Sequence, residues 1–105
     1  MKTKIVFITA IMAFVFVNAF SQNGKKYYKA GNEFMENLKY EDAIAQYTNA
    51  IGLEPSNSDY YFVRGEAYEK LGKIAEAKAD FEKVIVFDTK NADAIVHLGD
   101  LCNKT

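Results

Sequence analysis

The chain of 105 residues is poor in the side chains on which catalysis and metal binding depend. It has one histidine, His97, and one cysteine, Cys102, and no cluster of Cys or His at metal-ligand spacing. A Gly-rich phosphate loop is absent too, and Ser56 and Ser58 lie in an expected turn, where helix capping explains them. We therefore expect no catalytic residue, no metal site and no cofactor, and we predict that the chain is not an enzyme.

Clustered positive charge is equally scarce. Beyond residue 21, Lys25, Lys26 and Lys29 form the only close basic group, in a chain whose formal net charge is −1. Nucleic-acid binding needs a basic patch or stripe, so we expect no nucleic-acid partner. Acidic residues such as Asp80 and Glu82 follow the spacing of a polar helix face, which we interpret as solvated.

What the sequence does contain is an internal repeat with a step of 34 residues. Gly31 returns at this step as Gly65 and again as Gly99. The same step carries aromatic and small residues to similar ones: Tyr27 to Tyr61, Phe34 to Tyr68, Ala43 to Ala77 and Tyr47 to Phe81. A self-similar period of this length is typical of stacked supersecondary units.

Each period contains two segments with helical spacing. The predicted helices run from Lys25 to Leu38 and Glu41 to Leu53, then from Ser58 to Leu71 and Ile74 to Phe87. In the first helix of each pair, a Gly and aromatic residues share one face, and in the second helix small residues flank one ring. Because Gly lets two helix backbones approach closely, this pattern predicts knob-and-hole packing within each pair.

These residues resemble the tetratricopeptide repeat. The first unit, residues 24–57, carries Tyr27, Gly31, Phe34, Tyr40, Ala43, Tyr47, Ala50 and the closing Leu53, Glu54 and Pro55. The second unit, residues 58–91, carries Tyr61, Gly65, Tyr68, Leu71, Gly72, Ala77, Phe81, Phe87 and Asp88. The resemblance covers about four fifths of the chain. It implies an all-α, right-handed solenoid of helical hairpins, with two repeats and a C-terminal capping helix.

A few positions depart from the family pattern. Ala30 and Arg64 stand where the family usually has Leu, Leu38 where it has the inter-helix Gly, Val84 where it has Ala, and Thr89 where it has Pro. Pro55 is the only proline, and it stops helix propagation between the first two units. Residues 88–91 must turn by local hydrogen bonding alone, and we expect a turn there.

Residues 1–21 have the layout of a secretory signal peptide. Lys2 and Lys4 precede an apolar run, and small residues precede a cleavage site that we place before Gln22, with cleavage before Phe20 as the alternative. The competing interpretation is a retained membrane anchor over residues 5–20. Those 16 residues would make a helix of about 24 Å, against a hydrocarbon core of roughly 30 Å.

We therefore expect an exported chain, periplasmic or secreted, which meets the membrane only through this segment if it is uncleaved. Loss of Lys2 and Lys4 with the signal peptide leaves a net charge of −3.

Residues 92–105 have the pattern of the first helix of a third unit, and we predict a capping helix from Ala92 to Asn103 with Asn91 as its N-cap. Asn57 or Ser58 is the expected N-cap of the helix that starts the second unit. The capping face that would cover the helix at 74–87 consists of Ile95, Leu98, Gly99 and Cys102, with Asp93, Asp100, Asn103 and Lys104 facing water. Cys102 is then a small buried residue, and the alternative is a disulfide to a partner.

In the tetratricopeptide family the first helices of the units line a concave groove. The resemblance places nine residues there: Tyr28, Lys29, Asn32, Met35, Phe62, Val63, Glu66, Val96 and His97. An apolar strip rimmed by charge suggests a peptide or protein ligand. The alternative is that these side chains only pack against each other along adjacent helices.

One subgroup of the family clamps the C-terminal carboxylate of its ligand with Lys and Asn side chains. Only Asn32 is kept at the corresponding positions here, and Tyr28, Val63, Asp93 and His97 occupy the others. We expect no carboxylate clamp, because Asp93 would repel that ligand.

We thus predict a non-catalytic scaffold that binds a peptide or protein partner in its groove. The alternative is an oligomerisation module, a homo-oligomer formed through the ends of the repeat array. Apolar exposure on the last helix would favour the homo-oligomer, and apolar exposure in the groove would favour a foreign ligand. A third interpretation is an array that has lost its later units.

Overall fold

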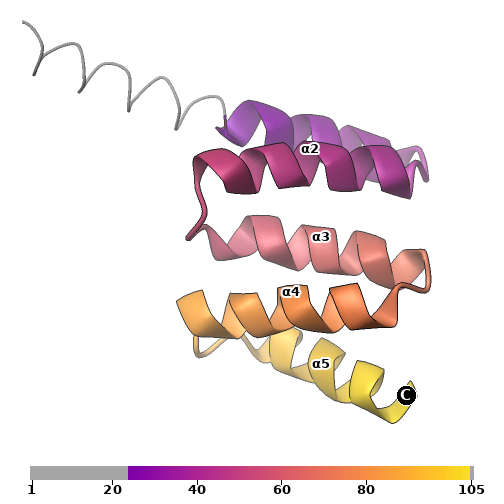
Figure 1. Cartoon of the computed structure of the whole chain (residues 1–105), viewed down its shortest axis with the longest axis vertical. Helices are drawn as coiled ribbons and strands as arrows, with labels where there is room; N and C mark the ends of the chain where they lie inside the picture. Colours follow the sequence, from indigo (N-terminus) through magenta and orange to yellow (C-terminus); the bar gives the residue numbers. More distant parts are fainter. Residues whose placement is uncertain (1–23, 105) are drawn as a thin grey trace, which may run out of the picture.

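The structure is a computed structural model that describes residues 24–104. Residues 24–36 are helical, and they are followed by α2 (Tyr40–Leu53), α3 (Ser58–Lys70), α4 (Ile74–Phe87) and α5 (Ala92–Lys104). Figure 1 shows these helices stacked in a row with alternating directions, and residues 24–104 contain no strand. The prediction of an all-α solenoid of helical hairpins is confirmed. The predicted signal peptide and its cleavage sites lie outside the described residues.

The bounds of the helices follow the predicted ones to within one or two residues, and their caps explain why. The side chain of Asn57 accepts a hydrogen bond from the backbone N–H of Asp59 at 3.1 Å, and Asn91 accepts one from Ala94 at 3.0 Å. The backbone N–H of Asn91 also donates to the carbonyl of Asp88 at 3.2 Å. Residues 88–91 therefore turn by local hydrogen bonds, as predicted for a turn without proline.

The turn that joins the two helices of each pair has the same geometry in both units, but its residue of positive φ is Leu38 in the first unit and Gly72 in the second. Lys39 donates its backbone N–H to Phe34 at 2.8 Å, and Lys73 donates to Tyr68 at 2.9 Å, one repeat later. Gly72 and Leu38 both have a left-handed backbone conformation, with a φ of 75° at Gly72 and 61° at Leu38. A side chain with a Cβ is disfavoured there, so the first turn carries backbone strain.

The core lies between the two helices of each pair. The rings of Tyr47 in α2 and Phe81 in α4 are fully buried, as are the small residues that flank them, Ala43, Ala50, Ala77 and Val84. A Cβ at Gly31 would collide with the ring of Tyr47, and one at Gly65 would lie 3.1 Å from the ring of Phe81. The predicted knob-and-hole packing is confirmed in both pairs.

Helix α5 packs through a face different from the predicted one. Its buried residues are Ala94 and Leu101, with Leu98 packed beside them. Ile95 is 51% exposed, and Gly99 and Cys102 are exposed as well. The prediction that these three residues cover α4, with Cys102 buried, is wrong.

The repeat explains this difference. One step earlier, Ala94 and Leu101 correspond to Tyr60 and Ala67, the buried side of α3 that faces the preceding unit. The exposed face of α5 corresponds instead to the side of α3 that packs on its own partner, α4. Helix α5 therefore attaches to the preceding unit and leaves the partner-facing side open.

Candidate peptide-binding groove

Three of the predicted groove residues come together beside the start of α3. Tyr28, Lys29 and Asn32 line a cavity of about 370 Å³. Helical spacing puts them on one face of residues 24–36, and Lys25, one turn earlier, completes that face. The opposite wall comes from α3 and the residue that caps it, Asn57, Asp59 and Tyr60.

The sequence prediction missed four of the seven lining residues. Lys25 was detectable, because it precedes Tyr28 and Lys29 by three and four residues on the same helical face. Asn57, Asp59 and Tyr60, at the boundary of the two units, carried no signal, since nothing in a repeat pattern states which residues at that boundary face the first helix.

An aromatic wall gives the cavity its apolar side. The ring of Tyr28 lies 5.3 Å from that of Tyr60 and 6.1 Å from that of Tyr47. Tyr60 donates its hydroxyl to Glu54 at 2.5 Å, and Tyr47 donates to the side-chain oxygen of Asn32 at 2.6 Å. Burial raises the pKa of both phenols, helped at Tyr60 by its bond to Glu54, so both stay protonated donors. The wall and Asn32 are thus fixed in place.

Charge at this end of the groove is mainly positive. Lys25 and Lys29 are both exposed at the rim of the cavity, and Asp59 is the one acidic residue in the lining. Amide groups of Asn32 and Asn57 complete the polar rim. The arrangement offers a ring for an apolar side chain and cationic and amide groups for a peptide backbone or an acidic side chain.

A second group of predicted residues lies between α3 and α5, and two of them serve the packing of the helices. His97 stacks on Phe81 at 4.9 Å, and Phe62 meets both rings edge-on at 5.6 and 5.5 Å. The Nδ1 atom of His97 lies 3.1 Å from the carboxylate of Glu69. For Phe62 and His97, the alternative of mutual packing between adjacent helices describes what the structure shows.

The rest of this end is acidic. Glu66 is half-buried, and burial raises the pKa of its carboxyl; His97 and Lys70 act in the opposite direction, whereas Glu69 and Asp93 add to the increase. The shift comes mainly from burial, and the carboxylates of Glu69 and Asp93 add a smaller increase.

The three other predicted residues differ in exposure. Met35 and Val63 are half-buried, and Val96 is 61% exposed. The nine residues thus fall into a group at the cavity, a group at the contact of α3 with α5, and these three.

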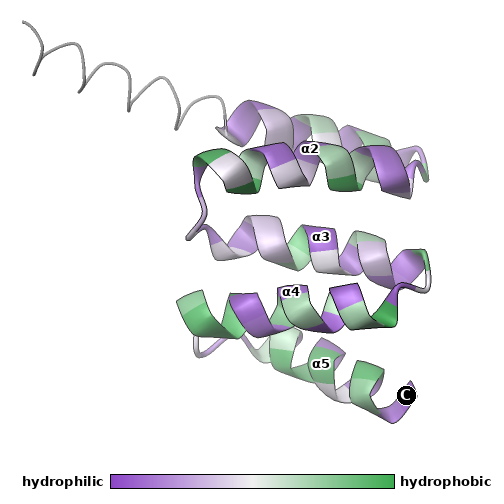
Figure 2. Cartoon of the chain, in the orientation of Figure 1, coloured by the Kyte–Doolittle hydropathy of each residue, from purple (hydrophilic) through white to green (hydrophobic). Residues whose placement is uncertain are grey.

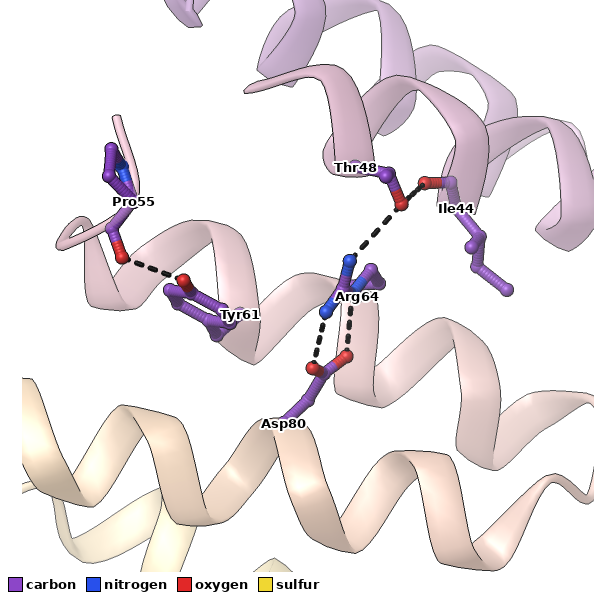
Figure 3. A network of polar contacts seen from close by, with 6 residues as sticks. All are labelled: Ile44, Thr48, Pro55, Tyr61, Arg64 and Asp80. Carbon is purple, nitrogen blue, oxygen red and sulfur yellow. Dashed lines mark hydrogen bonds and ion pairs between the residues drawn. The ribbon is translucent and has the colours of Figure 1, made fainter. Parts of the chain in front are cut away.

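An ion pair between α3 and α4 that the sequence prediction missed extends to α2 through a hydrogen bond (Figure 3). Arg64 of α3 donates to both carboxylate oxygens of Asp80 in α4, at 2.8 and 2.7 Å, and to the hydroxyl of Thr48 in α2 at 3.2 Å. The bonds to Asp80 raise the pKa of the guanidinium although burial lowers it. Asp80 is only 3% exposed, so its interpretation as part of a solvated face is wrong.

Two further observations concern the described residues as a whole. No set of three or more His, Cys, Asp or Glu side chains within residues 24–104 is arranged to hold a metal ion. None of the helices in that range combines the length and the apolar character that crossing a membrane requires.

Paired helices with a 34-residue step, and a ring seated on the inner glycine of both complete pairs, define a helical-repeat protein. Residues 28–94 match the family model of the tetratricopeptide repeat (TPR). The chain belongs to the tetratricopeptide repeat family.

Curated relatives share short stretches with this chain. It is 39% identical over 64 residues to the translocon at the outer membrane of chloroplasts 64 from Pisum sativum, which covers 61% of this chain and 11% of that protein. It is 41% identical over 58 residues to the Hsp70-Hsp90 organizing protein 2 of Arabidopsis thaliana, covering 55% of this chain and 10% of that protein. The chain therefore spans about a tenth of the length of these relatives.

Solved TPR domains share its fold. The second TPR domain of Spaghetti (RPAP3), bound to the HSP90 peptide SRMEEVD, is 30% identical with a TM-score of 0.76, covering 79% of this chain and 77% of that one. The second TPR domain of human RPAP3, in complex with the HSP70 peptide SGPTIEEVD, is 29% identical with a TM-score of 0.72, covering 81% and 77%. Each of those two domains is a peptide-binding module.

Proposed function

We propose that this chain is a non-catalytic scaffold that binds a peptide or protein segment along the first helices of its units. The observation that carries the proposal is the cavity of about 370 Å³, with an aromatic wall and a rim of lysine and amide groups. Two TPR domains of the same fold hold peptides in their solved complexes, which supports the same mode of use.

The proposed ligand differs in chemistry from the peptides of those two relatives. Both of those peptides end in the acidic sequence EEVD. In this chain the carboxylates of Asp93 and Glu69 add to the raised pKa of the half-buried Glu66, and Val63 and His97 stand where the family's carboxylate clamp has other residues. A ligand that spans the groove would place neutral or basic residues at the α3 and α5 end.

We also propose that the module acts after export, in the periplasm or as a secreted protein. This rests on the sequence of residues 1–21, with its basic start, apolar run and small residues before Gln22.

The groove proposal is tested by panning a random peptide library against the purified chain and measuring the affinity of selected peptides for variants. Lys29→Glu reverses a charge in the cavity lining, and should weaken binding by about tenfold or more, equivalent to about 1.4 kcal/mol. The matched control is Lys26→Glu, an exposed lysine on the same helix outside that lining, which should leave affinity nearly unchanged.

Peptides that bind both variants equally well would place the binding surface elsewhere. The peptides SRMEEVD and SGPTIEEVD serve as a second probe, and neither should bind. Tight binding of either one would contradict the proposed ligand chemistry while leaving the groove itself in place.

A further inference from the structure

Helix α5 leaves one face uncovered, and its place in the repeat indicates what kind of element fits there. We call this face, made by Ile95, Gly99 and Cys102, the open face. One step earlier its residues correspond to the side of α3 at Tyr61 and Gly65, both of which are buried under α4. The open face is thus the continuation in register of the established α3–α4 interface.

The glycines show the missing contact most directly. In both complete units, the inner glycine receives a ring from the second helix: Tyr47 lies against Gly31, and Phe81 lies against Gly65. At Gly99 nothing lies within 4 Å of where a Cβ would be. Helix α5 has the hole of the knob-and-hole pair without the knob.

Apolar exposure gathers around this hole. Ile95 on the open face is 51% exposed, and at the adjoining end of α4 Val86 is 66% and Phe87 42% exposed. Figure 2 shows these hydrophobic stretches at the end of α4 and along α5. The three residues of the open face carry no charge. Large apolar side chains that are exposed together near one end of a structure are a common feature of interaction sites.

We propose that the open face docks an α-helix of a partner protein, in the place that α2 and α4 occupy in the complete units. Because the interface continues in register, the partner helix needs the features of α4. These are an aromatic residue to enter beside Gly99, a small residue four positions before it and a small or β-branched one three positions after it, as Ala77, Phe81 and Val84 provide. The facing surface is apolar, since a charge buried there would lack a partner.

A second copy of this chain is a poorer occupant. Its α5 presents the same open face, which has no aromatic ring. Tyr47 and Phe81, the two rings that lie against the inner glycines of the complete units, are fully buried in their own copy. Phe87 is 42% exposed, but it lies in the last turn of α4 and has no small residue four positions before it, as Lys83 stands there. Filling the hole with Tyr47 or Phe81 of a second copy would require one of its repeats to open.

The test uses a helical peptide and the thiol of Cys102. The probe is a peptide with the sequence of residues 73–88, which contains α4 and has no cysteine, carrying Asp80→Ala. The substitution is needed because Leu98 stands in α5 at the position from which Arg64, in α3, pairs with Asp80. It is titrated into the full chain while the alkylation rate of Cys102 is measured. At a peptide concentration about ten times its dissociation constant, alkylation should slow by about tenfold, because only the uncovered molecules react. The same peptide with Phe81→Ala should protect the thiol little.

Two variants of the chain locate the binding. Gly99→Leu fills the hole and should abolish the protection, whereas Gly52→Leu should retain it, because Gly52 is also an exposed helical glycine with open space around it. Protection that survives in Gly99→Leu, protection by the Phe81→Ala peptide, or no protection at any concentration would each overturn the proposal. Without peptide, an alkylation rate that falls as the chain is concentrated would assign the open face to a second copy instead.

Discussion

At the scale of single residues, the contact between Arg64 and Asp80 differs most from what the pattern predicted. The side chains are only 18% and 5% exposed, and the guanidinium meets the carboxylate through two hydrogen bonds. An enclosed pair of this kind contributes little relative to an apolar pair of similar shape. Removing one partner is costly, because the other charge is left buried and unpaired.

We expect Asp80→Ala to lower the free energy of unfolding by about 3 kcal/mol, the lower end of the range for a broken buried pair, because Arg64 keeps some contact with water. The double variant Arg64→Leu with Asp80→Ala removes both charges and should recover most of that loss. Urea denaturation of the parent chain, the single variants Asp80→Ala and Arg64→Leu, and the double variant measures the coupling. Losses that simply add would mean that the two side chains do not stabilise each other.

The sequence contained one indication of this pair, the charged Arg64 at an inward-facing position, which helical spacing alone does not reveal. Periodicity placed Asp80 on a polar face, but it says nothing of the side chain opposite, which lies 16 residues earlier in the chain. Arg64 stands where the family usually has Leu, at a position that faces inward. A charged residue at an inward position requires a counter-charge, and the nearest carboxylate on the partner helix is Asp80.

At the scale of helices and turns, Leu38 is the position where local conformation and residue type disagree. Its φ of 61° is one that glycine adopts freely, and its side chain is 70% exposed, so it adds little packing. A residue with a Cβ costs about 1–2 kcal/mol in this conformation. Glycine gives back about 0.5–1 kcal/mol through the greater freedom of the unfolded chain.

Leu38→Gly should therefore stabilise the fold by up to about 1 kcal/mol, seen as a higher melting temperature. Gly72→Leu is the reciprocal control in the second turn, where φ is 75°, and it should lower the melting temperature. A Leu38→Gly chain that melts below the parent would show that the Leu38 side chain contributes more through packing than the strain costs.

The helices themselves were predictable, and the packing side of the last one was not. Repeated spacing of small and aromatic residues defines each helix in the sequence, and Asn57 and Asn91 mark two of the starts. The first helix of a unit has two apolar sides, one toward its own partner helix and one toward the preceding unit. The prediction assumed that α5 packs through the side that would face its own partner helix, which carries Ile95 and Cys102. In the structure α5 packs through the side that faces the preceding unit.

At the scale of the whole molecule, the repeat step was enough to predict the fold, because each unit contacts only its neighbours. It was less informative about the candidate site. Tyr28, Lys29 and Asn32 come together since one helix carries them, whereas Tyr60 joins them only across a boundary between units. The rings of Phe62 and His97 belong to the packing that joins α3, α4 and α5.

The export proposal also concerns the whole chain. When the full sequence is expressed in a bacterium with a secretory pathway, the purified product should begin at Gln22. It should be found in the periplasmic fraction or in the medium. Intact-mass analysis and cell fractionation check this together. A product that starts at Met1 and stays with the membranes would support the alternative, an anchor over residues 5–20.

The bridge from Arg64 to Thr48 has a consequence for how such an array can grow. If residues 58–91 were duplicated in tandem, the Arg64 of the new copy would meet Glu82 at the position where Arg64 now meets Thr48. Each added copy would then gain a charged contact with its predecessor. Duplicating residues 24–57 brings no such gain, because Ala30 holds the corresponding place. Of the two units, the second is the one suited to multiplication.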